Sequence, residues 1–124
     1  MSWVFDTSRP IFTQITERLT EDILCGRYPP GERLPSVREL AAEAAVNPNT
    51  VQRALVDLET AGLAMSSRGA GRCVTDDPAA IAAARKAMAL QLSQAYVQRM
   101  HALGLNDAEI DDVLAQIENG GSTQ

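Results

Sequence analysis

Histidine and cysteine are scarce in this sequence, which argues against metal and redox chemistry. The chain of 124 residues has one histidine, His101, and two cysteines, Cys25 and Cys73. The cysteines are far apart and lack the spacing of a zinc site or of a disulfide framework, so we expect two free, partly buried thiols and no metal or cofactor. No second ligand accompanies His101 in its predicted helix, so we expect a packed or surface histidine.

Long hydrophobic runs and enzyme signatures are absent as well. No stretch approaches the length needed to span a bilayer, and the N-terminus is not a charged-then-apolar leader, so we expect a soluble, cytoplasmic chain with no membrane partner. There is no GxSxG, HExxH or phosphate-binding glycine loop. The acidic segment 106–112 lacks the glycine and terminal glutamate of a calcium loop, and helix capping explains it better. We therefore expect no enzyme activity.

Positive charge is also in short supply. The net charge is −5 and the pI about 4.7, which by itself favours a protein-interaction module without DNA binding over a nucleic-acid binder. The charge is unevenly distributed, however. Residues 33–75 contain five arginines and four acidic residues, which gives +1, so the acid lies in the two flanking segments.

Helical spacing is clear in the first part of the chain. Ile11, Ile15, Leu19 and Ile23 recur every four residues, and Gly26 is a natural C-cap. The pattern predicts a first amphipathic helix that buries one face.

Two further helices follow a segment rich in proline. Ser36 and Glu39 have the capping-box spacing, so a second helix begins at Ser36 or the next residue. Asn47 is a preferred N-cap and Pro48 is well tolerated at the first helical position, which predicts a third helix from Pro48 to about Ala61. The residues expected to be buried on these two helices are Val37, Leu40, Ala41, Ala44, Val51, Ala54, Leu55 and Leu58.

A β-hairpin is predicted after the third helix. Two short apolar stretches flank "SSRGAG", residues 66–71, whose glycines permit a tight reversal with positive φ. The order of three helices followed by a hairpin is typical of a winged helix-turn-helix. We therefore expect a mainly α fold with a small β-hairpin wing.

The composition changes at residue 78 and divides the chain into three parts. We assign residues 1–77 to a winged helix-turn-helix domain, 78–118 to a helical dimerisation region and 119–124 to a disordered tail. Asp77 can cap a long helix that runs to Gly104. Asn106 and Glu109 repeat the capping-box spacing at the start of a shorter amphipathic helix.

The long helix is apolar around most of its circumference, which a helix lying on one small domain could not bury. We therefore expect this two-helix appendix to form a homodimer. The residues expected to contribute are Met88, Leu92, Tyr96, Ile110, Val113, Leu114 and Ile117. Two short helices cannot enclose the pocket of a typical small-molecule effector unless the dimer interface forms one, so an effector stays unidentified.

Four segments resemble successive motifs of one family, in order and spacing: "RPIFTQI", "LPSVRELA", "VNPNTVQRALVDLETAGL" and "RGAGRCV". Residues 9–75 are thereby similar to the DNA-binding domain of the GntR family of bacterial transcription regulators. The short helical appendix and the hexapeptide "VNPNTV" resemble the YtrA-type branch. The resemblance implies a dimeric, sequence-specific regulator, a repressor of a neighbouring transporter operon, whose partner is a double-stranded DNA operator with inverted-repeat symmetry.

A recognition helix places its N-terminal residues in the major groove, where amide and hydroxyl side chains can read bases without charge. The residues expected to do so are Asn47, Asn49, Thr50 and Gln52, with Arg53 directed at a base or an adjacent phosphate. In the family, the positions of Pro48 and Gln52 often carry base-reading arginines, so we do not expect a G-rich operator core.

Two further contacts flank the recognition helix. Arg38 stands where the family motif contacts DNA, and no acid lies one turn along its helix to compete for it. At the hairpin tip, Arg68 and Arg72 flank Gly69 and Gly71, and glycine lets a backbone approach DNA closely. Family members usually have threonine at the position of Arg72, so a solvated arginine is the alternative there.

Overall fold

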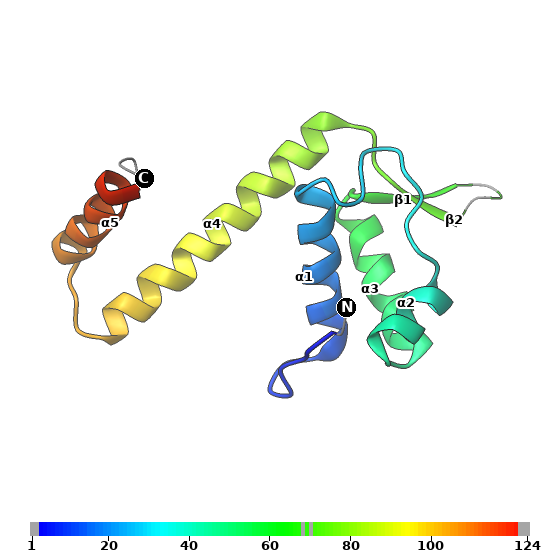
Figure 1. Cartoon of the computed structure of the whole chain (residues 1–124), viewed down its shortest axis with the longest axis horizontal. Helices are drawn as coiled ribbons and strands as arrows, with labels where there is room; N and C mark the ends of the chain where they lie inside the picture. Colours follow the sequence, from blue (N-terminus) through cyan, green and yellow to red (C-terminus); the bar gives the residue numbers. More distant parts are fainter. Residues whose placement is uncertain (1–2, 68, 70, 122–124) are drawn as a thin grey trace. The chain divides into compact units, whose positions relative to one another are not determined.

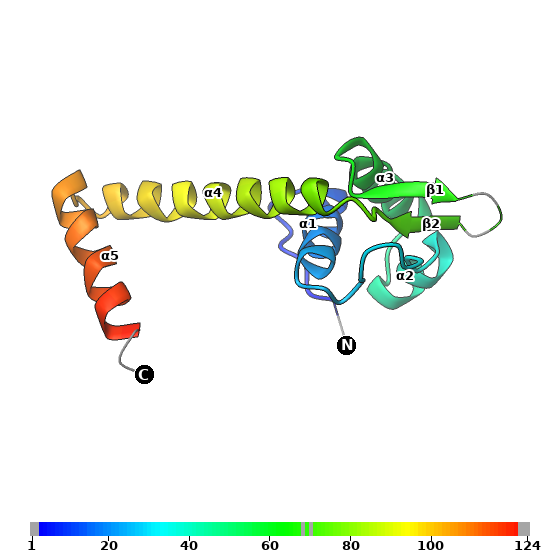
Figure 2. The same ribbon diagram turned by 90° about the horizontal axis from the view of Figure 1, so that it is seen from above.

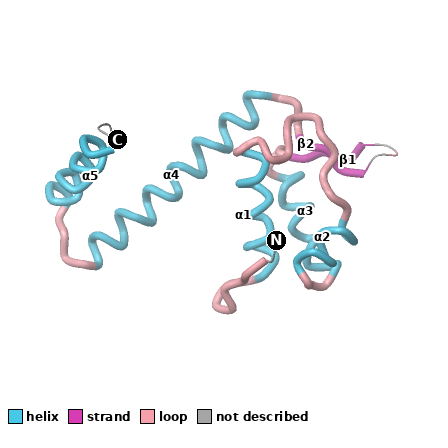
Figure 3. Tube along the Cα trace, in the orientation of Figure 1, coloured by secondary structure: helices cyan, strands magenta, loops and turns pink. Residues whose placement is uncertain are grey.

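The computed structural model describes residues 3–67, 69 and 71–121, which form helices and one two-stranded antiparallel sheet (Figure 3). This confirms the predicted fold class. The elements are α1 (Ile11–Leu24), α2 (Val37–Ala44), α3 (Pro48–Thr60), β1 (Ala64–Ser67), β2 (Gly71–Val74), α4 (Pro78–Ala102) and α5 (Asp107–Gly121). Among the residues just given, no helix is both long and apolar enough to cross a membrane.

The chain divides into two compact units, residues 1–85 and 86–124. The first unit contains α1, α2, α3, the hairpin and the first two turns of α4 (Figure 1). Its division from the second unit lies eight residues beyond the boundary that we predicted after Asp77. The reason is that Ile81 is buried, Ala84 packs against the core, and the Arg85 guanidinium donates a hydrogen bond of 2.9 Å to the Leu24 carbonyl at the end of α1.

Helix α1 buries Ile15, Leu19 and Ile23 of the predicted stripe, and Ile11 is half-buried against the same core. The predicted C-cap is one residue out of place. Cys25 is the C-cap, and Gly26 follows it with φ of +88°, the left-handed conformation that terminates helices. Because Cys25 stands in this final turn, it is exposed rather than partly buried, whereas Cys73 is partly buried as expected; both are free thiols.

The predicted capping box at the start of α2 is confirmed. The Ser36 amide donates to Glu39 Oε1 at 3.1 Å, and the Glu39 amide donates to Ser36 Oγ at 3.1 Å. Hydrogen bonds that the Glu39 carboxylate accepts from the backbone and the side chain of Ser36 hold the pKa of this carboxyl below its ordinary value. After α2, Ala45 takes a left-handed conformation with φ of +58°, which turns the chain toward α3.

Helix α3 lies against α1 and α2 and forms the centre of the first unit (Figure 1). Its predicted inner face, Val51, Ala54, Leu55 and Leu58, is buried. Segments outside the three helices contribute further core residues. Trp3 and Phe5 of the N-terminal segment also pack against this core. No local sequence pattern indicates either contribution. The core residues from outside the helices are Leu34, Leu63, Ala64 and Val74.

Strand β2 is held along both of its edges. On one side it pairs with β1 (Figure 2), and Ser66 of β1 stands opposite Arg72. On the other side, Arg33 forms a bridge to Cys73, and the Leu34 amide donates to the Arg72 carbonyl at 2.8 Å. The loop before α2 therefore acts as a third strand at the base of the wing.

The second unit contains the rest of α4 and α5. The predicted capping box is confirmed, with hydrogen bonds of 3.0 and 2.9 Å between Asn106 and Glu109. His101 is exposed, and its Nε2 lies 2.8 Å from Asp107 Oδ1. Helix α5 continues to Gly121, past the predicted start of the disordered tail at residue 119, because each residue added to an existing helix gains a hydrogen bond. The remainder of that predicted tail, 122–124, lies outside the described residues.

Candidate nucleic-acid interface

The first turns of α3 separate an apolar inner face from a polar outer face. Val51 and Ala54 point into the core, whereas Asn49, Gln52 and Arg53 are exposed. These exposed positions are three and four residues apart, so they lie side by side on one surface of the helix. Asparagine and glutamine amides pair bidentately with the major-groove edge of adenine, so this surface can read base pairs without a full charge.

Asn47 and Thr50 border the same surface. The Asn47 side-chain oxygen accepts a hydrogen bond of 2.8 Å from the Asn49 amide, so it serves as the N-cap of α3. This leaves the NH₂ group of Asn47 as the part of its side chain that can donate to DNA. Thr50 is half-buried beside it.

Arg53 lies over an aromatic ring from another helix. Its guanidinium carbon is 3.6 Å from the centroid of the Phe12 ring, in the first turn of α1. Together with Ile11, Asn49 and Thr50, these two residues line an open hollow of about 470 Å³. The contact therefore places a cation beside the residues that are expected to read bases.

Arg38 projects from the first turn of α2 and is exposed. The neighbouring carboxylate of Glu39 is occupied by the capping box with Ser36. Within residues 3–67, 69 and 71–121, no carboxylate pairs with Arg38. Its charge is therefore available to a phosphate or to a guanine edge.

Arg33 is a further exposed cation that we did not single out from the sequence. Its Nε would lie 3.9 Å from a Cβ built on Gly71, so the side chain runs along the start of β2. The bridge between Arg33 and Cys73 causes this placement. The pairing joins segments about forty residues apart, for which the local sequence pattern gives no signal.

The wing contains the predicted glycine geometry. Gly69 and Gly71 have φ of +80° and +73°, values that residues with a Cβ rarely adopt. Arg68, which we predicted as a DNA contact, lies outside the described residues. Arg72 points back to α3, where its Nε donates to Glu59 Oε1, and the Ser66 hydroxyl lies 3.4 Å from the other oxygen of the same carboxylate.

Apart from Arg72, which pairs with Glu59, and Arg85, which donates to the Leu24 carbonyl, the described arginines of the first unit fall into two groups. Those of α1 and its flanking loops are ion-paired: Arg9 with Glu17 at 3.1 Å, and Arg18 and Arg27 with Asp22 at 3.9 and 3.7 Å. The hydrogen bond to Glu17 also raises the pKa of Arg9. By contrast, within the part of the chain that the structure describes, Arg33, Arg38 and Arg53 form no ion pair, although the charge of Arg33 helps to lower the pKa of the Glu39 carboxyl. These three arginines lie on the helix-turn-helix and at the wing base, and a cation that contacts a DNA phosphate releases counterions.

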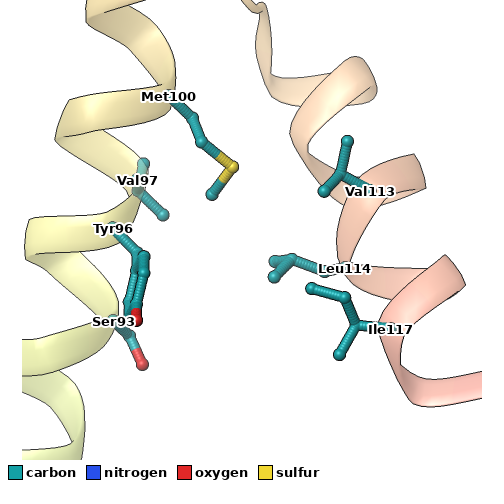
Figure 4. Close-up of a pocket in the computed structure, with 7 residues that line it drawn as sticks. All are labelled: Ser93, Tyr96, Val97, Met100, Val113, Leu114 and Ile117. Carbon is teal, nitrogen blue, oxygen red and sulfur yellow. The ribbon is translucent and has the colours of Figure 1, made fainter. Parts of the chain in front are cut away.

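The predicted dimerisation residues are only partly brought together. Figure 4 shows Tyr96 of α4 and Val113, Leu114 and Ile117 of α5 around an apolar hollow. Its volume is about 410 Å³. The hollow is also lined by Ser93, Val97 and Met100. Leu92 is exposed on α4 and Met88 is half-buried, but neither lines the hollow. Ile110 is buried within the unit, so its part in a dimer would be to support that face rather than to line it.

This fold and this distribution of charge define a DNA-binding protein of the winged helix-turn-helix class. The sequence profile described as "Bacterial regulatory proteins, gntR family" matches residues 12–74, which is half of the chain. The chain belongs to this family, and it is a transcription regulator rather than an enzyme. The family membership favours DNA binding over the protein-interaction module that the acidic pI suggested.

Relatives and solved structures agree with this assignment. The chain is 42% identical over 71 residues to the HTH-type transcriptional repressor YtrA of Bacillus subtilis, covering 57% of this chain and 55% of that protein. It is similar to a GntR family transcriptional regulator from Listeria monocytogenes, with a TM-score of 0.81, 37% identity and coverage of 90% and 98% of the two chains. The AraR DNA-binding domain in complex with operator ORX1 is also similar, with a TM-score of 0.54, 25% identity and coverage of 60% and 95%.

Proposed function

We propose that this protein is a homodimeric repressor of the YtrA type that acts in the cytoplasm on an inverted-repeat operator. The observation that carries the proposal is the polar outer face of α3, bordered by arginines that have no carboxylate partner among the described residues. A repressor role is supported by the similarity to the Bacillus subtilis repressor, and operator binding by the similarity to the AraR domain.

In this proposal, α3 enters the major groove and reads it with amide groups. Asn49 and Gln52 select adenine, and Thr50 supplies a hydroxyl at the edge of the same surface. Arg38 and Arg53 hold the phosphates or a guanine on either side. The predicted contacts of the wing, made through Arg68, Gly69 and Gly71, belong to the same proposal.

A second copy of the chain is the partner proposed for the second unit. Leu92 is 55% exposed, Tyr96 67% and Ile117 64%, so a monomer leaves large apolar side chains in water. A twofold axis through such a contact presents two identical α3 helices, which requires an inverted-repeat operator. Tethering makes the second half-site contact intramolecular, which strengthens binding without any new type of contact.

Footprinting of the protein on the DNA upstream of its own gene tests the operator and its symmetry together. We expect a protected inverted repeat with A·T pairs at the positions that α3 reads. Asn49→Ala and Gln52→Ala should change the preference among operator variants and leave binding to random duplexes nearly intact, because neither side chain is charged. Equal losses on specific and random DNA would show that these side chains only support the fold.

A further inference from the structure

We propose that Phe12 is a positioning residue for DNA binding, because its ring holds Arg53 where the guanidinium can meet the nucleic acid. The inference rests on the proposed function, in which Arg53 contacts the operator beside Asn49 and Thr50. It assigns a role in DNA binding to α1, the helix outside the helix-turn-helix pair.

The stacked geometry leaves the binding groups of Arg53 free. A guanidinium is planar, and its N–H groups point outward in that plane. The Phe12 ring occupies one face, with 3.6 Å between the guanidinium carbon and the ring centroid. The edges therefore stay open to a phosphate or a base edge in the hollow that Asn49 and Thr50 also line.

A carboxylate that could pair with Arg53 in place of the DNA lies one turn further along α3. Asp57 is four residues after Arg53 on α3, the spacing at which an arginine and an aspartate pair. The described chain nevertheless shows no ion pair between them, and Asp57 Oδ2 lies 3.5 Å from the Thr16 hydroxyl of α1. The Phe12 ring therefore keeps the guanidinium away from a carboxylate that would neutralise it.

Other stacked arginines in the chain are arranged differently. Arg18 lies 4.6 Å from the centroid of the Trp3 ring, and Arg27 lies 5.9 Å from that of Tyr28. Both of these arginines also pair with Asp22. Among the described residues, the Arg53 stack is thus the one that presents an uncompensated cation.

The test uses the full chain and two duplexes of about 30 base pairs, long enough for two half-sites one turn or more apart. One duplex is selected by the wild-type chain from a randomised library, and the other has random sequence. Phe12→Met keeps apolar bulk but removes the aromatic face, whereas Phe12→Tyr keeps the stack. Tyr28→Leu is the matched control, because it removes a stack beyond the opposite end of α1, about 20 Å away.

We expect Phe12→Met to weaken binding to the selected duplex by about two- to tenfold per half-site. This is the affinity lost when one long side chain that was held in place beforehand has to be ordered on binding. Its plot of log affinity against log salt should be shallower, since Arg53 turns to Asp57. Phe12→Tyr and Tyr28→Leu should bind like the wild type. Adding Asp57→Asn to Phe12→Met should restore part of the affinity and of the slope.

An Arg53→Ala background separates positioning from support of the fold. There, Phe12→Met should have no further effect on binding, and an equal loss with and without Arg53 would overturn the inference. Arg53→Lys offers an independent check, because it is an exposed change that keeps the charge but not the planar group. We expect the lysine variant to bind less tightly, and wild-type affinity would overturn the inference. If Arg53→Ala itself binds like the wild type, the proposed operator contact of Arg53 fails instead.

Discussion

Glu59 on α3 and Arg72 on β2 form an ion pair that ties the wing to the recognition helix. Ser66, which faces Arg72 across the hairpin, lies beside the same carboxylate, so Glu59 holds both strands of the wing. The pair is partly buried, with side-chain exposures of 19% for Arg72 and 30% for Glu59. Arg72 was predicted to contact DNA, and the pair with Glu59 suggests a second role that can be tested separately.

Arg72→Ala should lower the free energy of unfolding by about 1.5–3 kcal/mol, the range for a hydrogen bond to a charged group. The salt dependence of operator binding should stay nearly unchanged, because Glu59 already neutralises this arginine. Denaturant unfolding and operator titrations at several salt concentrations measure the two effects. A slope that becomes shallower by about 0.9, the value for one phosphate contact, would show that Arg72 contacts the DNA as first predicted.

Asn47 caps α3 and is also proposed to face the DNA, and two substitutions separate these two roles. Asn47→Ala removes the N-cap of α3 and should destabilise the protein by about 0.5–2 kcal/mol. Asn47→Asp keeps the cap, so its stability should be close to that of the wild type, but its operator affinity should fall because the new carboxylate faces phosphates. Thermal unfolding together with operator titration checks both statements. Wild-type affinity for Asn47→Asp would place this side chain away from the DNA.

The capping box at α2 should make stability depend on pH. Hydrogen bonds from Ser36 lower the pKa of the Glu39 carboxyl below its ordinary value of 4.5. A carboxyl whose pKa is lower in the folded state adds stability that is fully present above its unfolded pKa and is lost as the pH falls through the folded value. The stability difference between the wild type and Glu39→Gln should therefore be largest near neutral pH and shrink below pH 4.5. Denaturant unfolding across this range measures it, and a constant difference would contradict the prediction.

The stability of a truncated chain should depend on the residue at which the C-terminal appendix is removed. A chain ending at Arg85 keeps Ile81 and the hydrogen bond to Leu24, so it should fold as a monomer. Its operator affinity should fall by roughly 10²-fold or more, in keeping with the range for the loss of avidity. A chain ending at Asp77 lacks Ile81 and should be less stable by about 2 kcal/mol or more. Sedimentation and operator titration test both, and a shortened chain that binds as tightly as the whole would exclude a dimer as the source of the affinity.

Local signals in the sequence predicted most of the fold. Ser36 with Glu39 and Asn47 with Pro48 marked two helix starts, because capping needs only residues next to one another in the chain. Helical spacing likewise predicted the buried face of α3 that includes Val51.

The contacts that shape the interface are long-range, and the sequence did not reveal them. Arg33 beside Gly71, Arg53 over Phe12 and Trp3 Nε1 donating to Glu43 at 3.3 Å all join distant segments. No local periodicity in the sequence indicates such pairs, because they form only when the helices and the wing pack together. The sequence therefore predicted which residues face outward, but not which arginines would be left without a carboxylate.

The salt dependence of operator affinity for four arginine variants tests the central claim most directly. The claim is that the arginines without an ion pair on the helix-turn-helix and at the wing base form the DNA-binding face, and that the ion-paired arginines of α1 and its flanking loops do not. Arg33→Ala and Arg38→Ala should each make the plot of log affinity against log salt shallower, by about 0.9 for each phosphate that the side chain neutralises in the wild type. Arg9→Ala and Arg27→Ala should leave the slope at the wild-type value, because Glu17 and Asp22 already neutralise these side chains. Equal slopes for all four variants, or a change confined to Arg9 and Arg27, would contradict the account.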